Sequence, residues 1–178
     1  MDFRDIKEFM NDMIKYIITA FVVIFIVVYI VSVQQVVGPS MNPTLKEGDI
    51  LILDKISYRM RDIRRNEVVA LKYDASKYLV KRIIGLPGEN IEYKDNYLYI
   101  DGKKYQETIY DNMKTDDFTL EEIAGIDKIP DDMYLVLGDN RGNSQDSRDS
   151  KIGLIKKSDI LGRTFIRIWP LNGIKLVK

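Results

Sequence analysis

The chain has 178 residues, 27 of them basic and 27 acidic, and it contains neither cysteine nor histidine. The balanced charge gives no indication of nucleic acid or of a strongly acidic substrate as a partner. Without cysteine and histidine the chain forms no disulfide, no thiolate nucleophile and no Ser-His-Asp triad, so a serine nucleophile needs a lysine, a carboxylate or a metal as its base. No stretch has the spacing of a calcium loop, and we expect neither a metal nor a cofactor.

A long apolar segment dominates the N-terminal part of the chain. From Tyr16 to Val37 there are 22 consecutive residues without a formal charge, and as a helix they span a hydrocarbon core of about 30 Å. The alternatives are a cleaved signal peptide and a buried core helix; the run is long for the first and this domain is small for the second. We therefore predict a membrane anchor over 16–37, with the lipid bilayer as a partner.

The flanks of this segment predict its orientation. Three cations precede it within the first fifteen residues, whereas the first cation after it is Lys46. The positive-inside rule places the cation-rich flank in the cytoplasm. We expect a single-pass protein of the cell membrane, with a cytoplasmic segment over 1–15 and an extracytoplasmic domain over 38–178.

A short segment with two prolines follows the anchor directly. Gly38 and Pro39 end any helix that runs into it, and Pro43 favours an extended conformation for the residue before it. Ser40 and Met41 should therefore lie on a stiff, non-helical stretch that presents the serine. The alternative is an ordinary turn serine, which is common beside proline.

The remainder of the chain has the pattern of a mainly β protein. Short apolar runs between polar ends predict strands over 49–54, 67–72, 78–84, 91–93, 97–100, 103–105, 133–137 and 160–168. The dipeptide Asp101-Gly102 predicts a type I′ hairpin turn. Residues 106–130 are acidic and poorly patterned, which indicates a surface insertion or a small cap. No helix of useful length is predicted after the anchor.

Lys81 interrupts the apolar strand predicted over 78–84. One interpretation is a lysine at a sheet edge whose aliphatic stem covers apolar surface while its amine reaches water. The other is a desolvated amine, whose pKa falls because burial disfavours its charged form. A neutral lysine is able to deprotonate a serine, and in a chain without histidine Lys81 is the strongest candidate base.

A polar run over 138–150 follows the strand predicted at 133–137. A segment so rich in Asp, Asn, Gly and Ser often makes only local bonds between side chains and backbone. It also offers Ser144 as a partner for a lysine amine, and Asp146 with Arg148 as a charge-assisted pair that stiffens the loop.

Four segments together carry a family resemblance: GPSMNPTL at 38–45, GDILILDK at 48–55, VKRIIGLPGE at 80–89 and LGDNRGNSQDSR at 137–148. In this order, behind an N-terminal anchor, they resemble the conserved boxes of bacterial type I signal peptidase. The resemblance implies a β-rich catalytic domain with a Ser-Lys dyad. It assigns Ser40 as nucleophile and Lys81 as general base. Ser144 matches the serine that orients the lysine, and Asp146 and Arg148 match a structural salt bridge.

The chain departs from the family pattern at Gly38, where some members have a serine that helps to bind the oxyanion. Its short segment after the lysine box resembles the Gram-positive forms. The expected function is removal of signal peptides from exported preproteins at the outer membrane surface. Three alternatives stay open: a peptidase dedicated to one substrate class such as pilins, a self-cleaving Ser-Lys regulator, and a non-catalytic anchored β-module.

Overall fold

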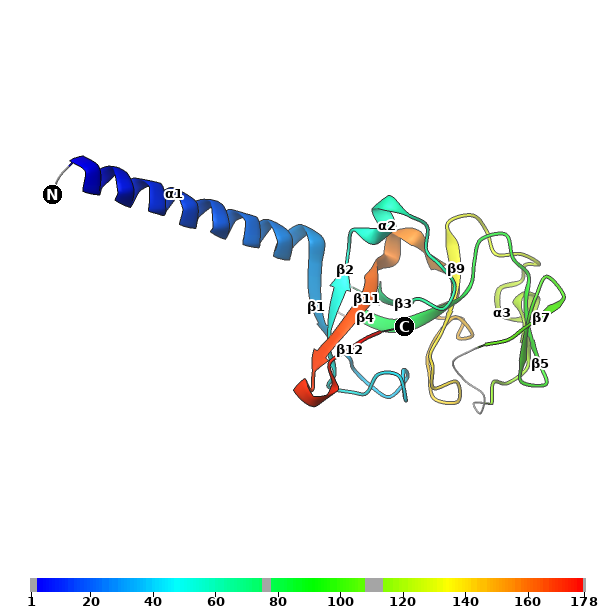
Figure 1. The fold of residues 1–178 in the computed structure, drawn as a ribbon. Coiled ribbons are helices and arrows are strands. Elements are labelled where there is room, and N and C mark those ends of the chain that lie inside the picture. Colours follow the sequence, from blue (N-terminus) through cyan, green and yellow to red (C-terminus); the bar gives the residue numbers. More distant parts are fainter. Residues whose placement is uncertain (1–2, 75–77, 108–113, 178) are drawn as a thin grey trace.

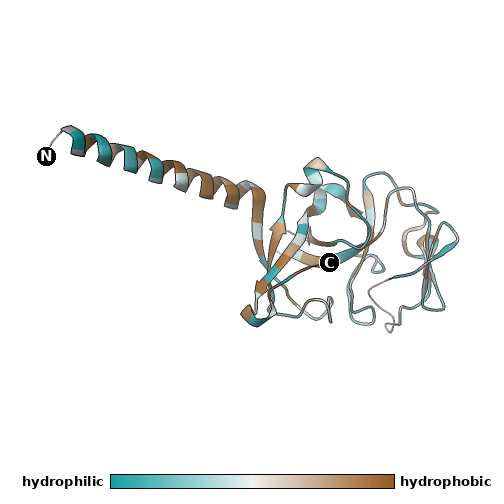
Figure 2. Ribbon diagram, viewed as in Figure 1, coloured by the Kyte–Doolittle hydropathy of each residue, from teal (hydrophilic) through white to brown (hydrophobic). Residues whose placement is uncertain are grey.

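The computed structural model describes residues 3–74, 78–107 and 114–177 and consists of one long helix and a β-rich body (Figure 1). Helix α1 (Phe3–Phe25) continues into one stretch of π-helix, η1 (Ile26–Ile30), and extends away from the body. Figure 2 shows its hydrophobic residues concentrated in the half nearer the body. The stretch Ile6–Ile30 is long and apolar enough to cross a membrane, and none of its most apolar window is buried in the protein.

The apolar run Tyr16–Val37 does not form one helix, and in this respect the prediction is wrong. The helix ends at Ile30, and the following residues form strand β1 (Val31–Gln35). This strand pairs antiparallel with β2 (Ile50–Asp54), with Val31 opposite Asp54 and Gln35 opposite Ile50. Pairing with β2 satisfies the backbone groups of β1 that face β2, and its β-branched valines suit a strand.

The larger sheet has eight strands in the order β1-β2-β11-β3-β4-β9-β10, with β12 paired to β11. The strand pairs in it are antiparallel. The bounds are β3 (Val68–Lys72), β4 (Tyr78–Gly85), β9 (Met133–Leu137), β10 (Ile155–Lys156), β11 (Ile160–Trp169) and β12 (Lys175–Leu176). The strands predicted over 49–54, 67–72, 78–84, 133–137 and 160–168 are confirmed to within one residue at each end.

The smaller sheet has the order β7-β6-β5-β8 and forms the second lobe of the body (Figure 1). Its strands are β5 (Ile91–Lys94), β6 (Tyr97–Ile100), β7 (Lys103–Tyr105) and β8 (Phe118–Thr119). The turn between β6 and β7 has positive φ at both Asp101 (50°) and Gly102 (74°), which confirms the predicted type I′ turn.

The segment predicted as an insertion or small cap contributes to the core beneath the smaller sheet. Residues 108–113 of it lie outside the described residues. In the remainder, β8 leads into helix α3 (Leu120–Ala124), which begins with a capping box on Thr119. Leu120 and Ile129 are buried with Phe118 in one apolar cluster. The described part of this segment is therefore a packed cap rather than an exposed loop.

Three further short helical elements lie in the connections between strands. Helix α2 (Ser57–Met60) follows β2, and the 3-10 turns η2 (Lys157–Asp159) and η3 (Leu171–Gly173) flank β11. A separate apolar cluster lies beneath the segment that carries Ser40 and includes Met41, Leu45, Leu51 and Val68. This cluster fixes the Ser40 segment against the larger sheet.

Candidate active site

Ser40 lies in a turn between β1 and β2 that is fixed at both ends. Met41 is completely buried in the core beside it. On the outer side, the amide of Asn140 donates to the Ser40 carbonyl at 2.9 Å, and the Asn140 side chain donates to the Pro39 carbonyl at 3.2 Å. Gly38 has φ of +78°, a left-handed conformation that glycine adopts without strain. The serine is thus held on a short segment with little freedom to move.

Pro43, the other predicted member of this segment, lies on its exposed side in the turn after Met41. The segment is not helical, as the sequence predicts. Two single turns occur in it: the Asn42 amide donates to the Pro39 carbonyl at 3.0 Å, and the Leu45 amide donates to the Met41 carbonyl at 2.9 Å.

Lys81 lies on β4 and reaches the serine directly. Its Nζ is hydrogen-bonded to Ser40 Oγ at 2.7 Å, although the two residues are 41 positions apart in the chain. The lysine is only 2% exposed, which excludes the interpretation in which its amine reaches water. Burial lowers the pKa of the Lys81 amine from 10.5 to about 8, against the opposing effect of the Asp146 and Asp139 charges.

A buried ion pair lies beside the lysine. Arg82, the next residue on β4, donates from Nε and Nη2 to the two carboxylate oxygens of Asp139 at 2.8 and 2.7 Å. Both side chains are almost fully buried. Two parallel charge-assisted bonds fix orientation as well as distance. The pair therefore fastens the loop after β9 to the strand that carries Lys81.

The loop after β9 is stiffened by a second ion pair. Arg148 Nε lies 2.8 Å from Asp146 Oδ1, and the other carboxylate oxygen accepts a bond from the Gly138 amide at 2.9 Å. Burial favours a higher pKa for Asp146, but the Arg148 bond and the Gly138 amide outweigh it and hold that pKa below its ordinary value. Asp146 is therefore ionised at neutral pH and holds the loop closed.

Ser144 and Ser40 both lie close to Gly138, at the position where a side chain would begin. A Cβ at Gly138 would lie 2.1 Å from Ser144 Oγ and 2.6 Å from the Ser40 carbonyl oxygen, so only glycine fits there. The Ser144 oxygen helps to lower the pKa of Asp146, yet it forms no hydrogen bond of good geometry within the described part of the chain. The structure therefore brings Ser144 into the site but does not bond it to Lys81.

A small cavity of about 20 Å³ lies beside the dyad. Its walls come from β1, the Ser40 segment and the part of β3 and β4 around Lys81, and they include Val36, Ala70 and Leu79. Among residues 3–74, 78–107 and 114–177, no group of three or more acidic side chains is arranged to hold a metal ion.

Sequence reasoning missed the residues that join the loop to the dyad. Asn140, Asp139 and Arg82 all lie inside recognised motifs, but no local pattern indicates which residues they bond. A buried arginine next to a buried lysine was the available signal, since two adjacent cations on one strand require an acidic partner.

The chain is similar to proteins of one known family. The family model described as "Signal peptidase, peptidase S26" matches residues 10–169. "Signal peptidase I" of Bacillus caldolyticus is 40% identical over 152 residues, covering 81% of this chain and 82% of that protein. "Signal peptidase IB" of Staphylococcus aureus is 36% identical over 182 residues, covering 95% and 94%.

A solved structure of a signal peptidase I is also similar to this chain. The crystal structure of a signal peptidase I from Enterococcus faecalis V583 is 36% identical in sequence and superposes with a TM-score of 0.51. The match covers 97% of that chain and 58% of this one.

Proposed function

The chain belongs to the signal peptidases of peptidase family S26, and from this we propose that it removes signal peptides from exported preproteins with Ser40 and Lys81 as its catalytic pair. The family makes the chain a serine peptidase, a hydrolase of the bacterial type I signal peptidase group. The observation that carries the assignment of residues is the 2.7 Å contact between a buried lysine amine and the Ser40 hydroxyl.

The proposed chemistry is acyl transfer. Neutral Lys81 takes the hydroxyl proton while Ser40 Oγ attacks the carbonyl of the scissile peptide bond. The resulting ammonium returns this proton to the leaving amine. Water then hydrolyses the ester formed on Ser40, with the lysine again as base. A pKa of about 8 for Lys81 keeps a useful fraction of the amine neutral near neutral pH.

The amide of Ser40 is the proposed donor to the oxyanion. Gly38 has no hydroxyl to contribute, and the Ser40 amide donates to no group among the residues that the structure describes. Donors positioned before the reaction stabilise developing charge without reorganisation. The roles of the remaining predicted residues follow from their contacts. Asp146 and Arg148 stiffen the loop after β9 through bonds within it, and Ser144 lies in that loop.

The proposed substrate preference follows from the space beside the dyad. A cavity of about 20 Å³ is large enough for a very small side chain and too small for an aromatic or branched one. Signal-peptide cleavage sites carry small residues of this kind. Both a general signal peptidase and one dedicated to a single substrate class satisfy this condition.

We also propose that α1 anchors the protein in the membrane with its N-terminus in the cytoplasm. Its apolar half and the cations before it support this orientation. Only nine residues separate Ile30 from Ser40, and this short connection supports a position of the dyad near the surface where a substrate's cleavage site emerges. Protease added outside intact spheroplasts should digest the β-rich body, whereas full protection would mean the opposite orientation.

Purified full-length protein in detergent, incubated with a panel of signal-peptide-bearing preproteins, tests the activity. We expect cleavage after a small residue at the end of the signal peptide, located by N-terminal sequencing of the product. The same preproteins without their signal peptides are the control and should remain intact. Cleavage of pilin precursors alone would identify a dedicated peptidase, and no cleavage of any precursor would contradict the proposal.

A further inference from the structure

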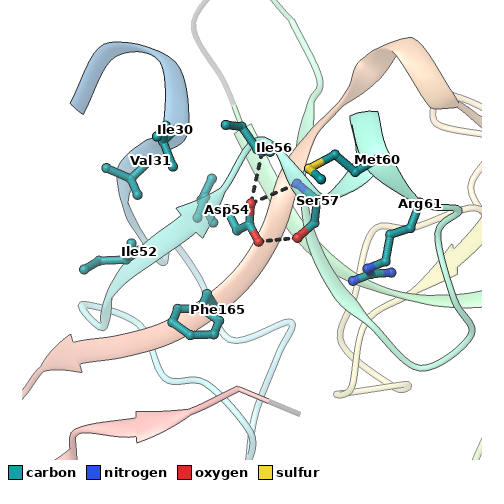
Figure 3. A pocket seen from close by; sticks show the side chains of 10 residues that line it. Ile30, Val31, Ile52, Asp54, Ile56, Ser57, Met60, Arg61 and Phe165 are labelled. Carbon is teal, nitrogen blue, oxygen red and sulfur yellow. Dashed lines mark hydrogen bonds between the residues drawn. The ribbon is translucent and has the colours of Figure 1, made fainter. Parts of the chain in front are cut away.

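A second and larger cavity lies away from Ser40 and Lys81, where α1 and η1 meet the body (Figure 3). Its volume is about 490 Å³, within the range of roughly 300–1,000 Å³ that is typical of ligand sites. Apolar side chains from four places make most of its wall: Ile30 at the helix end, Ile52 on β2, Met60 on α2 and Phe165 on β11. We call this cavity the interface groove.

The one carboxylate in the wall of the interface groove is satisfied internally. Asp54 accepts bonds from the amides of Ile56 and Ser57, each at 3.0 Å, and from the Ser57 hydroxyl (Figure 3). Burial favours a higher pKa for Asp54, but these bonds outweigh it and hold the pKa below its ordinary value. The carboxylate therefore needs no partner from a ligand, and the groove presents an apolar interior.

The interface groove lies next to the apolar end of the N-terminal helix, which indicates lipid as the apolar molecule that reaches it. Ile30 and Val31, which form one wall, directly follow the apolar half of α1. Lys55 joins the β-rich body to η1, since its amine donates to the Val28 carbonyl at 2.7 Å. Met60, which lines the groove, is an apolar residue that is 81% exposed to solvent. With α1 in a bilayer, the groove lies at the lipid surface, where acyl chains surround it.

The stretch of chain around α2 that lines the interface groove is basic. Residues 55–61, four of which line the groove, contain three cations and no acid. Arg61, which lines the groove, is paired with Glu67 at 2.6 Å. Arg59 is exposed in α2 next to Met60 and forms no ion pair within the described residues, and the Lys55 amine binds only a neutral carbonyl. Lys55 and Arg59, the chain neighbours of the lining residues Ile56 and Met60, thus carry two cationic charges without an ion-pair partner among the described residues, which complements an anionic headgroup.

We propose that the interface groove binds an anionic phospholipid, with one acyl chain in the groove and the phosphate at Lys55 and Arg59. The proposal rests on the anchoring of α1 in the membrane, and not on the peptidase chemistry. Attraction of this kind strengthens binding roughly fivefold for each cation at an anionic surface. Loss of both charges should therefore weaken the preference for anionic lipid on the order of 25-fold.

Photo-crosslinking in vesicles tests the proposal with the full chain. The probes are phosphatidylglycerol and phosphatidylcholine that carry the same photoreactive acyl chain, each at trace level in phosphatidylcholine vesicles, and the crosslinked peptides are mapped by mass spectrometry. We expect phosphatidylglycerol to label residues 52–60 at least tenfold more than phosphatidylcholine. The double variant Lys55→Gln/Arg59→Gln should reduce this labelling to the phosphatidylcholine level.

The control is Lys103→Gln/Lys128→Gln, which removes two exposed cations from the lobe of the smaller sheet and should leave the labelling unchanged. Thermal unfolding of both variants establishes that they are folded. Labelling of α1 without labelling of 52–60, or equal labelling by the two probes, would overturn the lipid site while the anchor stands. Absence of labelling in α1 itself would overturn both the lipid site and the proposed membrane anchor.

Discussion

The pH dependence of cleavage is the most quantitative consequence of the site. A pKa of about 8 for Lys81 leaves roughly one amine in eleven neutral at pH 7, half at pH 8 and ten in eleven at pH 9. An unperturbed lysine with a pKa of 10.5 would leave about one amine in three thousand neutral at pH 7. Because only the neutral amine accepts the serine proton, kcat/KM should rise about tenfold between pH 7 and pH 9.

The assay is the initial rate of precursor cleavage by the full-length protein from pH 6 to pH 10, at precursor concentrations well below KM. Circular dichroism over the same range excludes unfolding as the cause of a change. Below pH 7 the rate should fall close to tenfold per pH unit, since one proton is involved. A profile that is flat from pH 6 to pH 9, or one with its midpoint near 10.5, would refute the assignment of Lys81 as a desolvated base.

Three substitutions extend the test. Lys81→Arg should abolish cleavage, because a guanidinium does not deprotonate in this range, and near-normal turnover would exclude Lys81 as the base. Asp139→Ala leaves the buried charge of Arg82 without its partner and should lower the free energy of unfolding by about 3–5 kcal/mol. An unchanged midpoint in a denaturant titration would mean that the ion pair does not contribute to stability. Gly138→Ala places a Cβ 2.1 Å from Ser144 Oγ and 2.6 Å from the Ser40 carbonyl oxygen, so it should lower kcat and also lower the free energy of unfolding by about 1–3 kcal/mol. An unaltered kcat would show that the loop yields without moving the dyad.

The strands that the sequence predicted are those with enough residues to show a pattern. Ile50–Asp54 and Val68–Lys72 are apolar runs between polar ends, and the structure confirms both. Strands β8, β10 and β12 have two residues each, too few for any periodicity. Strand β1 was missed for another reason: Val31–Gln35 continues the uncharged run of the helix, and only its pairing with β2 ends the helix at Ile30.

The candidate site was partly predictable. Ser40 and Lys81 were named from the motifs and from the absence of histidine, and the fold brings their side chains into contact. The bond between Arg82 and Asp139 was not predictable, because the two residues are 57 positions apart and meet only when β4 and β9 pair. Whether Ser144 orients Lys81 stays a prediction, since the two side chains are not bonded in this structure.

Single-turnover cleavage of one precursor by Ser40→Ala tests directly whether Ser40 is the nucleophile. The matched control is Ser150→Ala, which removes an exposed hydroxyl outside the dyad. We predict no cleaved product from Ser40→Ala over many wild-type half-times, with unfolding unchanged and with wild-type rates for Ser150→Ala. Substantial cleavage at the same bond by folded Ser40→Ala protein would contradict it.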